Sequence, residues 1–323
     1  MIRYNLRKEI LEKLAKREVK DIKLRKNVSI SDFIKDIYDA CISPYDDMEL
    51  AMNILEEAYK DKDCIHFLGI PGYFLATGAR GIISDLIRKG FVDVLVIEED
   101  GLDYDIARSL GGSYYRIMTR NVNNALLHQL RVHRIGNLIF TRESHELLLT
   151  RFVLNTLDKM TNREKLSLTE ILSILSRGID DEDSVVRNAF KYRVTLIPTS
   201  IWRSTVLNLI FAWAHKEGVQ LDILGLYKEM ANIINYAKRT CAIIVSKEAR
   251  TLIGWWNQFR GGIDYLVHIM DPGSIEEVDA FGDTSNYELT WSMIKRNGKY
   301  ITIKAPRLFA FILLVDLLYE KIS

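Results

Sequence analysis

The sequence predicts an α/β fold in which a doubly wound, mostly parallel sheet carries helices on both faces and follows a helical N-terminal arm. Two apolar runs, Ile65–Ile70 and Val92–Ile97, are joined by a glycine-containing turn and an amphipathic helix, which is the pattern of a βαβ unit. Helical and strand-like segments then alternate to the end of the chain with no linker rich in proline, glycine or serine. We therefore expect one α/β domain over residues 61–323, preceded by a basic arm and helices over residues 1–60.

Composition and charge exclude several classes of protein. With 323 residues, 48% of them hydrophobic, the chain can bury a large core, and its net charge of +1 gives no field that favours nucleic acid. The three cysteines are far apart and lack metal-binding spacing, so we expect free thiols and no metal site. No apolar run reaches the length of a membrane span, and no signal peptide is evident. These features predict a cytoplasmic protein that binds neither nucleic acid nor membranes.

The arm and the first helices are predicted from charge and periodicity. Residues 1–27 are markedly basic and start with an amphipathic stretch, which fits a mobile arm, a helix docked on a partner subunit or a solvated helix. Two helical patterns follow at 29–40 and 46–60. In the βαβ unit, Gly90 stands where the C-terminal cap of the connecting helix is expected.

The remaining segments alternate between the 3.6-residue periodicity of helices and the two-residue periodicity of strands. Ser167 and Glu170 form a capping-box pattern at the start of one of these helices. Helices are expected at 103–110, 143–160, 167–177, 183–192, 205–215, 222–239, 247–260 and 287–296, and strands at 137–141, 194–198, 241–245, 265–270 and 300–305, before a last helix that begins at Pro306.

Two segments of the βαβ unit suggest a ligand site. The first loop, Pro71–Gly78, and the start of the next helix offer backbone N–H groups to a phosphate, although the glycine spacing is not GxGxxG. Glu98, Glu99 and Asp100 follow the second strand, at the edge where α/β sheets bind ligands. A loop that simply faces water explains these three carboxylates equally well.

The order of segments resembles that of the deoxyhypusine synthases, from about Glu18 to Ile322. The resemblance is carried by VKDIKL at 19–24, HFLG at 66–69, TGARGIISDLIRKGFVDVLV at 77–96, HRIGNL at 133–138, EILSILSRGIDDEDSVVRNAFKYRVTLIP at 170–198, RGGIDYLVHI at 260–269 and ELTW at 288–291. It implies a Rossmann-like fold, tetramers built from tight dimers, and active sites at the dimer interface. It also implies NAD-dependent oxidation of spermidine, whose aminobutyl group passes through an imine on a lysine to translation factor 5A.

The lysine that the resemblance requires is missing. It should come two residues after a tryptophan, and Trp291 is present, but the position is occupied by Met293. A thioether cannot form an imine, because that step needs a primary amine with a free electron pair. Lys295 lies two residues further on, about 200° round the predicted helix, and so would face the other way.

Other positions that the resemblance assigns to substrate binding are also changed. A glutamate is replaced by Tyr287, a histidine by Thr251, and two aspartates by Arg203 and Asn208. We expect Arg203 to repel a cationic substrate.

The resemblance implies NAD as cofactor, with contacts from the segments that follow the first and the second strand of the βαβ unit. The first loop keeps Thr77, Gly78 and Arg80, and the family's glycine pair after the second strand reads Asp100-Gly101. The ribose-binding glutamate aligns with Tyr104, which leaves Asp103 or Asp105 to accept a ribose hydroxyl.

Three functions remain open. The changes at Met293, Tyr287, Thr251 and Arg203 favour a catalytically degenerate protein that pairs with an active deoxyhypusine synthase subunit or binds another ligand, in a homo-tetramer or a hetero-oligomer, with translation factor 5A as a further partner. The second is an active NAD-dependent synthase or related aminobutyl transferase with a relocated lysine, for which Lys247 is a candidate. The third is a structural oligomer without a ligand.

Overall fold

The centre of the molecule is a six-stranded parallel sheet. The structure is a computed structural model that describes residues 21–23, 26–40, 45–118, 122–160, 164–272 and 293–322. The strands lie in the order β11-β10-β9-β1-β2-β7, and are β1 (Cys64–Ile70), β2 (Val94–Ile97), β7 (Thr195–Pro198), β9 (Arg239–Ile244), β10 (Ile263–Met270) and β11 (Ile294–Lys304). Counted along the chain within this sheet, the order is 3-2-1-4-5-6, as in the Rossmann fold, and it reverses between β1 and β9.

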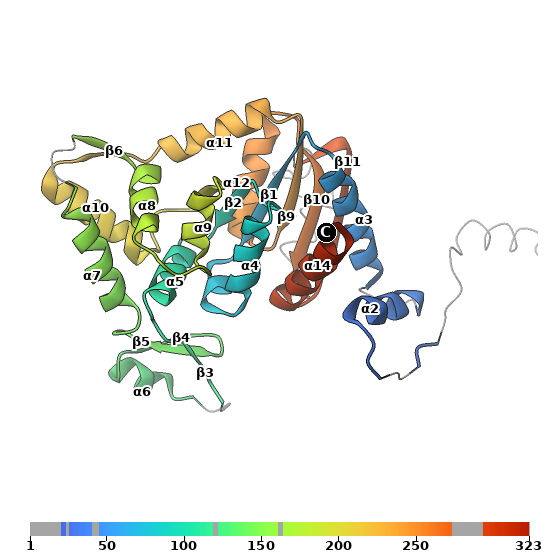
Figure 1. The fold of residues 1–323 in the computed structure, drawn as a ribbon, viewed down its shortest axis with the longest axis horizontal. Helices are drawn as coiled ribbons and strands as arrows, with labels where there is room; N and C mark the ends of the chain where they lie inside the picture. The colour runs from blue at the N-terminus through green and yellow to red at the C-terminus, as the bar shows by residue number, and fades with distance from the viewer. Residues whose placement is uncertain are drawn as a thin grey trace, which may run out of the picture.

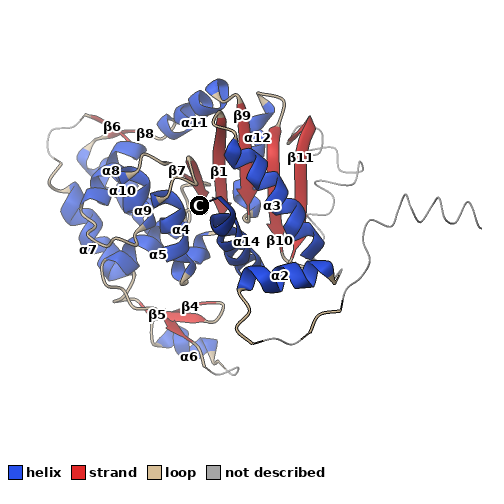
Figure 2. Cartoon of the chain, turned by 45° about the vertical axis from the view of Figure 1, so that its right-hand side comes forward, coloured by secondary structure: helices blue, strands red, loops and turns tan. Residues whose placement is uncertain are grey.

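Helices cover both faces of this sheet (Figures 1 and 2). One face packs against α3, α4 and α14 and belongs to the larger hydrophobic core, while α11 and α12 close a second core on the other face. The helices are α2 (Ile30–Asp39), α3 (Tyr45–Lys60), α4 (Ala79–Arg88), α5 (Asp100–Ser109), α7 (Glu146–Leu157), α8 (Leu168–Arg177), α9 (Val185–Lys191), α10 (Thr205–Glu217), α11 (Gly225–Tyr236), α12 (Lys247–Gln258) and α14 (Arg307–Ile322). The short 3-10 helix η1 (Gly72–Ala76) follows β1.

Two small sheets stand outside the central one. An antiparallel sheet of β3 (Tyr115–Arg116), β5 (Leu138–Thr141) and β4 (Val132–Ile135) lies with α6 (Asn124–Gln129) at one end of the molecule in Figure 1. A parallel pair joins β6 (Lys165–Ser167) to β8 (Gln220–Asp222). No helix in the ranges that the structure describes is long and apolar enough to cross a membrane.

The predicted fold class is confirmed, and so are two local signals. Ser167 and Glu170 form the reciprocal hydrogen bonds of a capping box, and Gly90 has a φ of 75° just past the end of α4. The helix predicted from residue 222 begins at Gly225, because residues 220–222 pair with β6. The boundary proposed at residue 60 stays a prediction, although α3 packs directly on α14 and β11.

The helix predicted for 287–296 is wrong at its end. Residues 287–292 lie outside the described ranges, but β11 already begins at Ile294. The amide of Ile263 donates to the carbonyl of Met293 at 2.7 Å, which joins this segment to β10. Gly298 permits the irregular pairing that follows, since a Cβ there would lie 2.9 Å from the Ile263 carbonyl oxygen.

Candidate functional site

Polar side chains gather at the carboxyl edge of the sheet, beside the point where the strand order reverses. Glu98, Glu99 and Asp100 follow β2, Ser246 and Glu248 follow β9, and the loop after β1 lies between them in the strand order. Open α/β sheets bind their ligands at this position. We call this set, with Arg203, the carboxyl-edge cluster.

Glu98 and Glu248 form a carboxyl pair at the start of α12. Ser246 caps this helix by accepting from the amide of Ala249 at 3.1 Å, and its hydroxyl donates to Glu98 Oε1 at 2.7 Å. Burial, together with the adjacent Glu248 carboxylate, raises the pKa of Glu98 to about 7 against the opposing bond from Ser246. Burial would raise the pKa of Glu248 as well, but the hydrogen bond from Glu98 lowers it. The pair therefore titrates as one unit that shares a proton near neutral pH.

Glu99 is fully buried, and both of its carboxylate oxygens accept hydrogen bonds. It accepts from Ser200 Oγ at 2.6 Å, Thr199 Oγ1 at 3.0 Å and Arg203 Nε at 2.9 Å. Burial alone would raise its pKa, but these bonds outweigh it and hold the pKa of Glu99 at about 2. Because the charge of Arg203 is balanced by Glu99, the expectation that Arg203 repels a cation loses its main support.

Asp100 lies directly over the loop that follows β1. A Cβ at Gly72 would overlap Asp100 Oδ1 and would lie 2.6 Å from the amide nitrogen of Gly101. Burial raises the pKa of Asp100, against Arg203 and a hydrogen bond from Tyr104. The two glycines thus let η1 and the start of α5 touch backbone to backbone.

Asp103 and Asp105 anchor other helices rather than facing the edge. Asp103 accepts from Ser204 Oγ at 2.7 Å and from the amide of Val206 at 3.0 Å, at the start of α10. Asp105, fully buried, accepts from Ser184 Oγ and the amide of Val186, both at 2.8 Å, at the start of α9. Carboxylates at helix N-termini satisfy free amides and favour the helix dipole.

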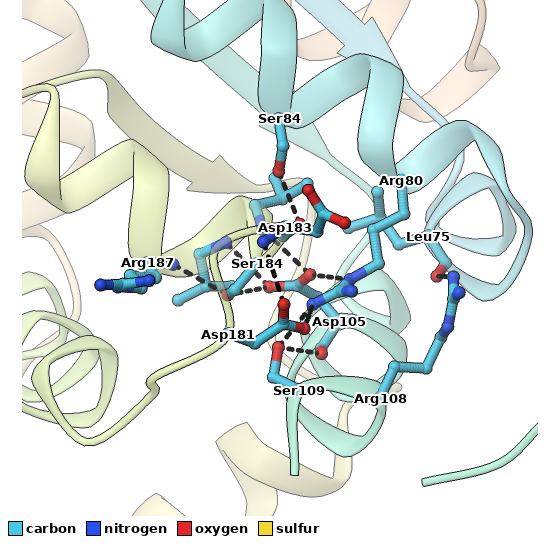
Figure 3. A network of polar contacts seen from close by, with 12 residues as sticks. Leu75, Arg80, Ser84, Asp105, Arg108, Ser109, Asp181, Asp183, Ser184 and Arg187 are labelled. Carbon is cyan, nitrogen blue, oxygen red and sulfur yellow. Dashed lines mark hydrogen bonds and ion pairs between the residues drawn. The ribbon is translucent and has the colours of Figure 1, made fainter. Parts of the chain in front are cut away.

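Arg80 completes this internal network (Figure 3). Its guanidinium donates to Asp105 at 2.7 Å, and to Ser109 Oγ and Asp181 at 2.6 Å each. With 6% of its surface exposed, Arg80 ties α4 to α5 and to the loop before α9. The prediction that Arg80 and Asp103 contact a cofactor stays a prediction that these contacts do not support.

The cradle expected for a dinucleotide fits NAD poorly. In the first loop the amides of Phe74 and Thr77 bond to carbonyls within the loop, and the amide of Ala79 donates to Thr77 Oγ1 at 3.2 Å. Gly78 is the N-cap of α4 and is exposed. The space that Gly72 leaves is taken by the carboxylate of Asp100, which is a poor neighbour for a pyrophosphate.

Two further predicted positions lie apart from the cluster's contacts. Thr251 is exposed on α12 and donates to the carbonyl of Lys247 at 3.2 Å, while Asn208 donates to the carbonyl of Trp202 at 3.4 Å. Tyr287 and Trp291 lie outside the described residues. Within the described ranges, no group of three or more His, Cys, Asp or Glu side chains is placed to hold a metal ion.

Met293 lies at the opposite, amino edge of the sheet. Its side chain is 1% exposed and packs on Gly254 of α12, where a Cβ would lie 2.6 Å from the Met293 methyl carbon. Lys295 lies in β11, so the helical argument about its direction is wrong. Its amine is nevertheless already bound, because Lys295 Nζ donates a hydrogen bond to Asp264 Oδ1 at 2.7 Å.

The pairing of Glu98 with Ser246 and Glu248 was not foreseen. The sequence placed a serine and a glutamate at the start of a helix after a strand, but the strand order that brings this helix to Glu98 is a property of the whole sheet.

Comparisons with known proteins agree with this fold. The deoxyhypusine synthase family profile matches residues 45–316, well over half of the chain. A protein from Ignicoccus hospitalis described as "Probable deoxyhypusine synthase" is 27% identical over 300 residues, covering 90% of this chain and 92% of that protein. A protein of the same description from Sulfurisphaera tokodaii is 26% identical over 298 residues, covering 90% and 94%.

A solved structure supports the fold alone. The crystal structure of a protein provisionally assigned as a deoxyhypusine synthase from Entamoeba histolytica has a TM-score of 0.59 at 14% identity, covering 94% of this chain and 97% of that one. Sheet order and carboxyl-edge cluster thus define a Rossmann-like α/β protein with a site at its topological switch point. The chain belongs to the deoxyhypusine synthase family. Members of this family are in general NAD-dependent transferases.

Proposed function

We propose that this chain is a catalytically degenerate member of the deoxyhypusine synthase family that acts as a partner or regulatory subunit. Its role would be to assemble with an active synthase, or with further copies of itself, rather than to form the imine. The alternative of an active synthase with a relocated lysine draws support from the names of its relatives.

The burial of Met293 carries the proposal. The side chain at the position of the expected lysine is 1% exposed and packs against the backbone of α12 at Gly254. The nearest lysine along the chain is paired with Asp264, which is also bound by Arg260 at 2.7 Å. These contacts hold the Lys295 amine against Asp264, whereas imine formation needs a free amine placed at the carbonyl or imine carbon.

The test is transfer of label from radioactive spermidine to translation factor 5A, with NAD present, by the purified chain. We expect no transfer and no borohydride-trapped adduct on the chain. When the chain is mixed with a lysine-bearing synthase, we expect a stable hetero-oligomer by light scattering and a changed transfer rate. Labelled adduct on the chain alone would refute the proposal.

Two variants keep the result interpretable. Met293→Lys asks whether the missing amine is the whole defect, and we expect it to stay inactive because an ammonium at this buried position would lose its hydration. If the parent chain does transfer label, Lys295→Met and Lys247→Met identify the amine that replaces the missing one.

A further inference from the structure

We propose that the carboxyl groups of Glu98 and Asp100, with Glu248 beside them, exclude NAD and other dinucleotides from this chain, although its family uses NAD. This inference concerns the carboxyl edge of the sheet. It does not depend on Met293 or on the proposed function.

The first step is the position of these carboxylates. In a sheet of order 3-2-1-4-5-6, the pyrophosphate of a dinucleotide lies at the carboxyl ends of the first strands, beside the N-terminus of the helix after strand one. In this chain that place lies between the ends of β1, β2 and β9. Glu98 and Asp100 stand at the end of β2, and Glu248 stands at the end of β9.

The second step is the balance of charge. The Arg203 guanidinium is shared by three of the cluster's four carboxyl groups, Glu99, Asp100 and Glu248, and Glu99 already binds it. Lys247 is exposed in the first turn of α12, and Arg250 in the same turn is buried and lies near His268, at the end of β10. A pyrophosphate brings two more negative charges, so the cluster repels it even when Glu98 and Glu248 share a proton.

The third step is the missing approach to backbone amides. A dinucleotide needs glycines where its phosphates come close to the main chain. Here Gly72 and Gly101 instead serve contact between η1 and α5, and the Asp100 carboxylate fills the space over Gly72. The amides of Phe74, Thr77 and Ala79 are bonded within the loop.

The fourth step concerns the ribose. The acidic side chains that could accept its hydroxyls, Asp103 and Asp105, hold the starts of α10 and α9. Tyr104 donates to Asp100. Charge, backbone access and ribose acceptors therefore all oppose the same ligand.

The experiment is calorimetric titration of the full chain with NAD and separately with ADP-ribose, which carries the pyrophosphate without the positive nicotinamide. For the wild type we expect no saturable heat up to about 1 mM of either probe. The double variant Glu98→Gln, Asp100→Asn removes two carboxyl groups with little change of shape and leaves the Glu99–Arg203 pair intact. We expect both probes to bind it at least about tenfold more tightly, with an affinity that falls as salt is raised.

A matched control removes the same number of carboxyl groups at a distance. Asp316→Asn with Glu320→Gln removes two exposed carboxylates from α14 and should bind neither probe better than the wild type. Saturable binding of NAD by the wild type at micromolar concentration would overturn the proposal. So would a double variant that is folded by circular dichroism yet gains no affinity, since the carboxylates would then not be the cause. Neither result bears on imine formation, so this proposal and the proposed function can fail separately.

Discussion

The two edges of the central sheet carry opposite kinds of side chain. At the amino edge, the position of the expected lysine carries Met293, whose side chain has become part of the core under α12. At the carboxyl edge, Glu98 and Asp100 keep ionisable groups half-buried at a cost in desolvation. Half-buried ionisable groups with shifted pKa values are concentrated at functional sites. The carboxyl edge therefore has the side chains of a candidate ligand site, whereas the amino edge at Met293 is packed in the way that stabilises a core.

The largest effect on the free energy of unfolding should come from replacing Asp105, a carboxylate near the carboxyl edge whose role is purely structural. Asp105→Ala leaves the buried Arg80 guanidinium with Asp181 as its remaining ion-pair partner and removes the anchor of α9. We expect the free energy of unfolding to fall by about 3–5 kcal/mol, measured by urea denaturation. The exposed Asp85, paired with Arg88 at 2.5 Å, supplies the control, and Asp85→Ala should change the same quantity by about 0.5 kcal/mol or less. Equal effects of the two substitutions would mean that Asp105 is not an anchor.

Sequence reasoning predicted most of the fold because the main signals are local. The apolar runs of β1 and β2, the cap at Gly90 and the capping box at Ser167 depend on residues close in the chain. In the small antiparallel sheet only β5 was predicted, from the strand pattern at 137–141. The strands β3, β4, β6 and β8 were missed, because strands of two to four residues carry too little periodicity to be detected.

The site was harder to predict, because its contacts join residues far apart in the chain. Asp103 and Asp105 were proposed as ribose acceptors because they flank Tyr104, which the family resemblance aligns with a ribose-binding glutamate, but which helices they cap depends on tertiary packing. Met293 was identified from its distance to Trp291. Its contact with Gly254 is set by the pairing of β10 with β11 and could not be read from spacing.

A smaller effect on the free energy of unfolding is expected at Gly254, and it tests how tightly Met293 packs at the amino edge. Gly254→Ala places a Cβ 2.6 Å from the Met293 methyl carbon and 3.0 Å from its Cγ, and should cost about 1–3 kcal/mol of unfolding free energy. In the background of Met293→Ala the same substitution should cost less by about 1 kcal/mol, because the clash is gone. Gly81→Ala, in α4 with nothing within 4 Å of the new Cβ, should stabilise by about 0.5–1 kcal/mol. If Gly254→Ala behaved like Gly81→Ala, the packing of Met293 would be looser than described.

The smallest effect should come from the proton of Glu98. Because its folded pKa of about 7 lies above the ordinary value of 4.5, the folded state binds more protons than the unfolded state between these two pH values. Its contribution to stability is therefore full below about pH 4.5 and is lost as the pH rises through about 7. Allowing for solvent screening, the loss should be about 1 kcal/mol between pH 5 and pH 8. Other carboxyls titrate in the same range, including Asp103, so the quantity to measure is the difference between the wild type and Glu98→Gln in urea denaturation at each pH. That difference should move in favour of the variant as the pH rises. If the stability difference between the wild type and Glu98→Gln did not change with pH, Glu98 would be a solvent-exposed loop carboxylate without the interactions described at the carboxyl edge.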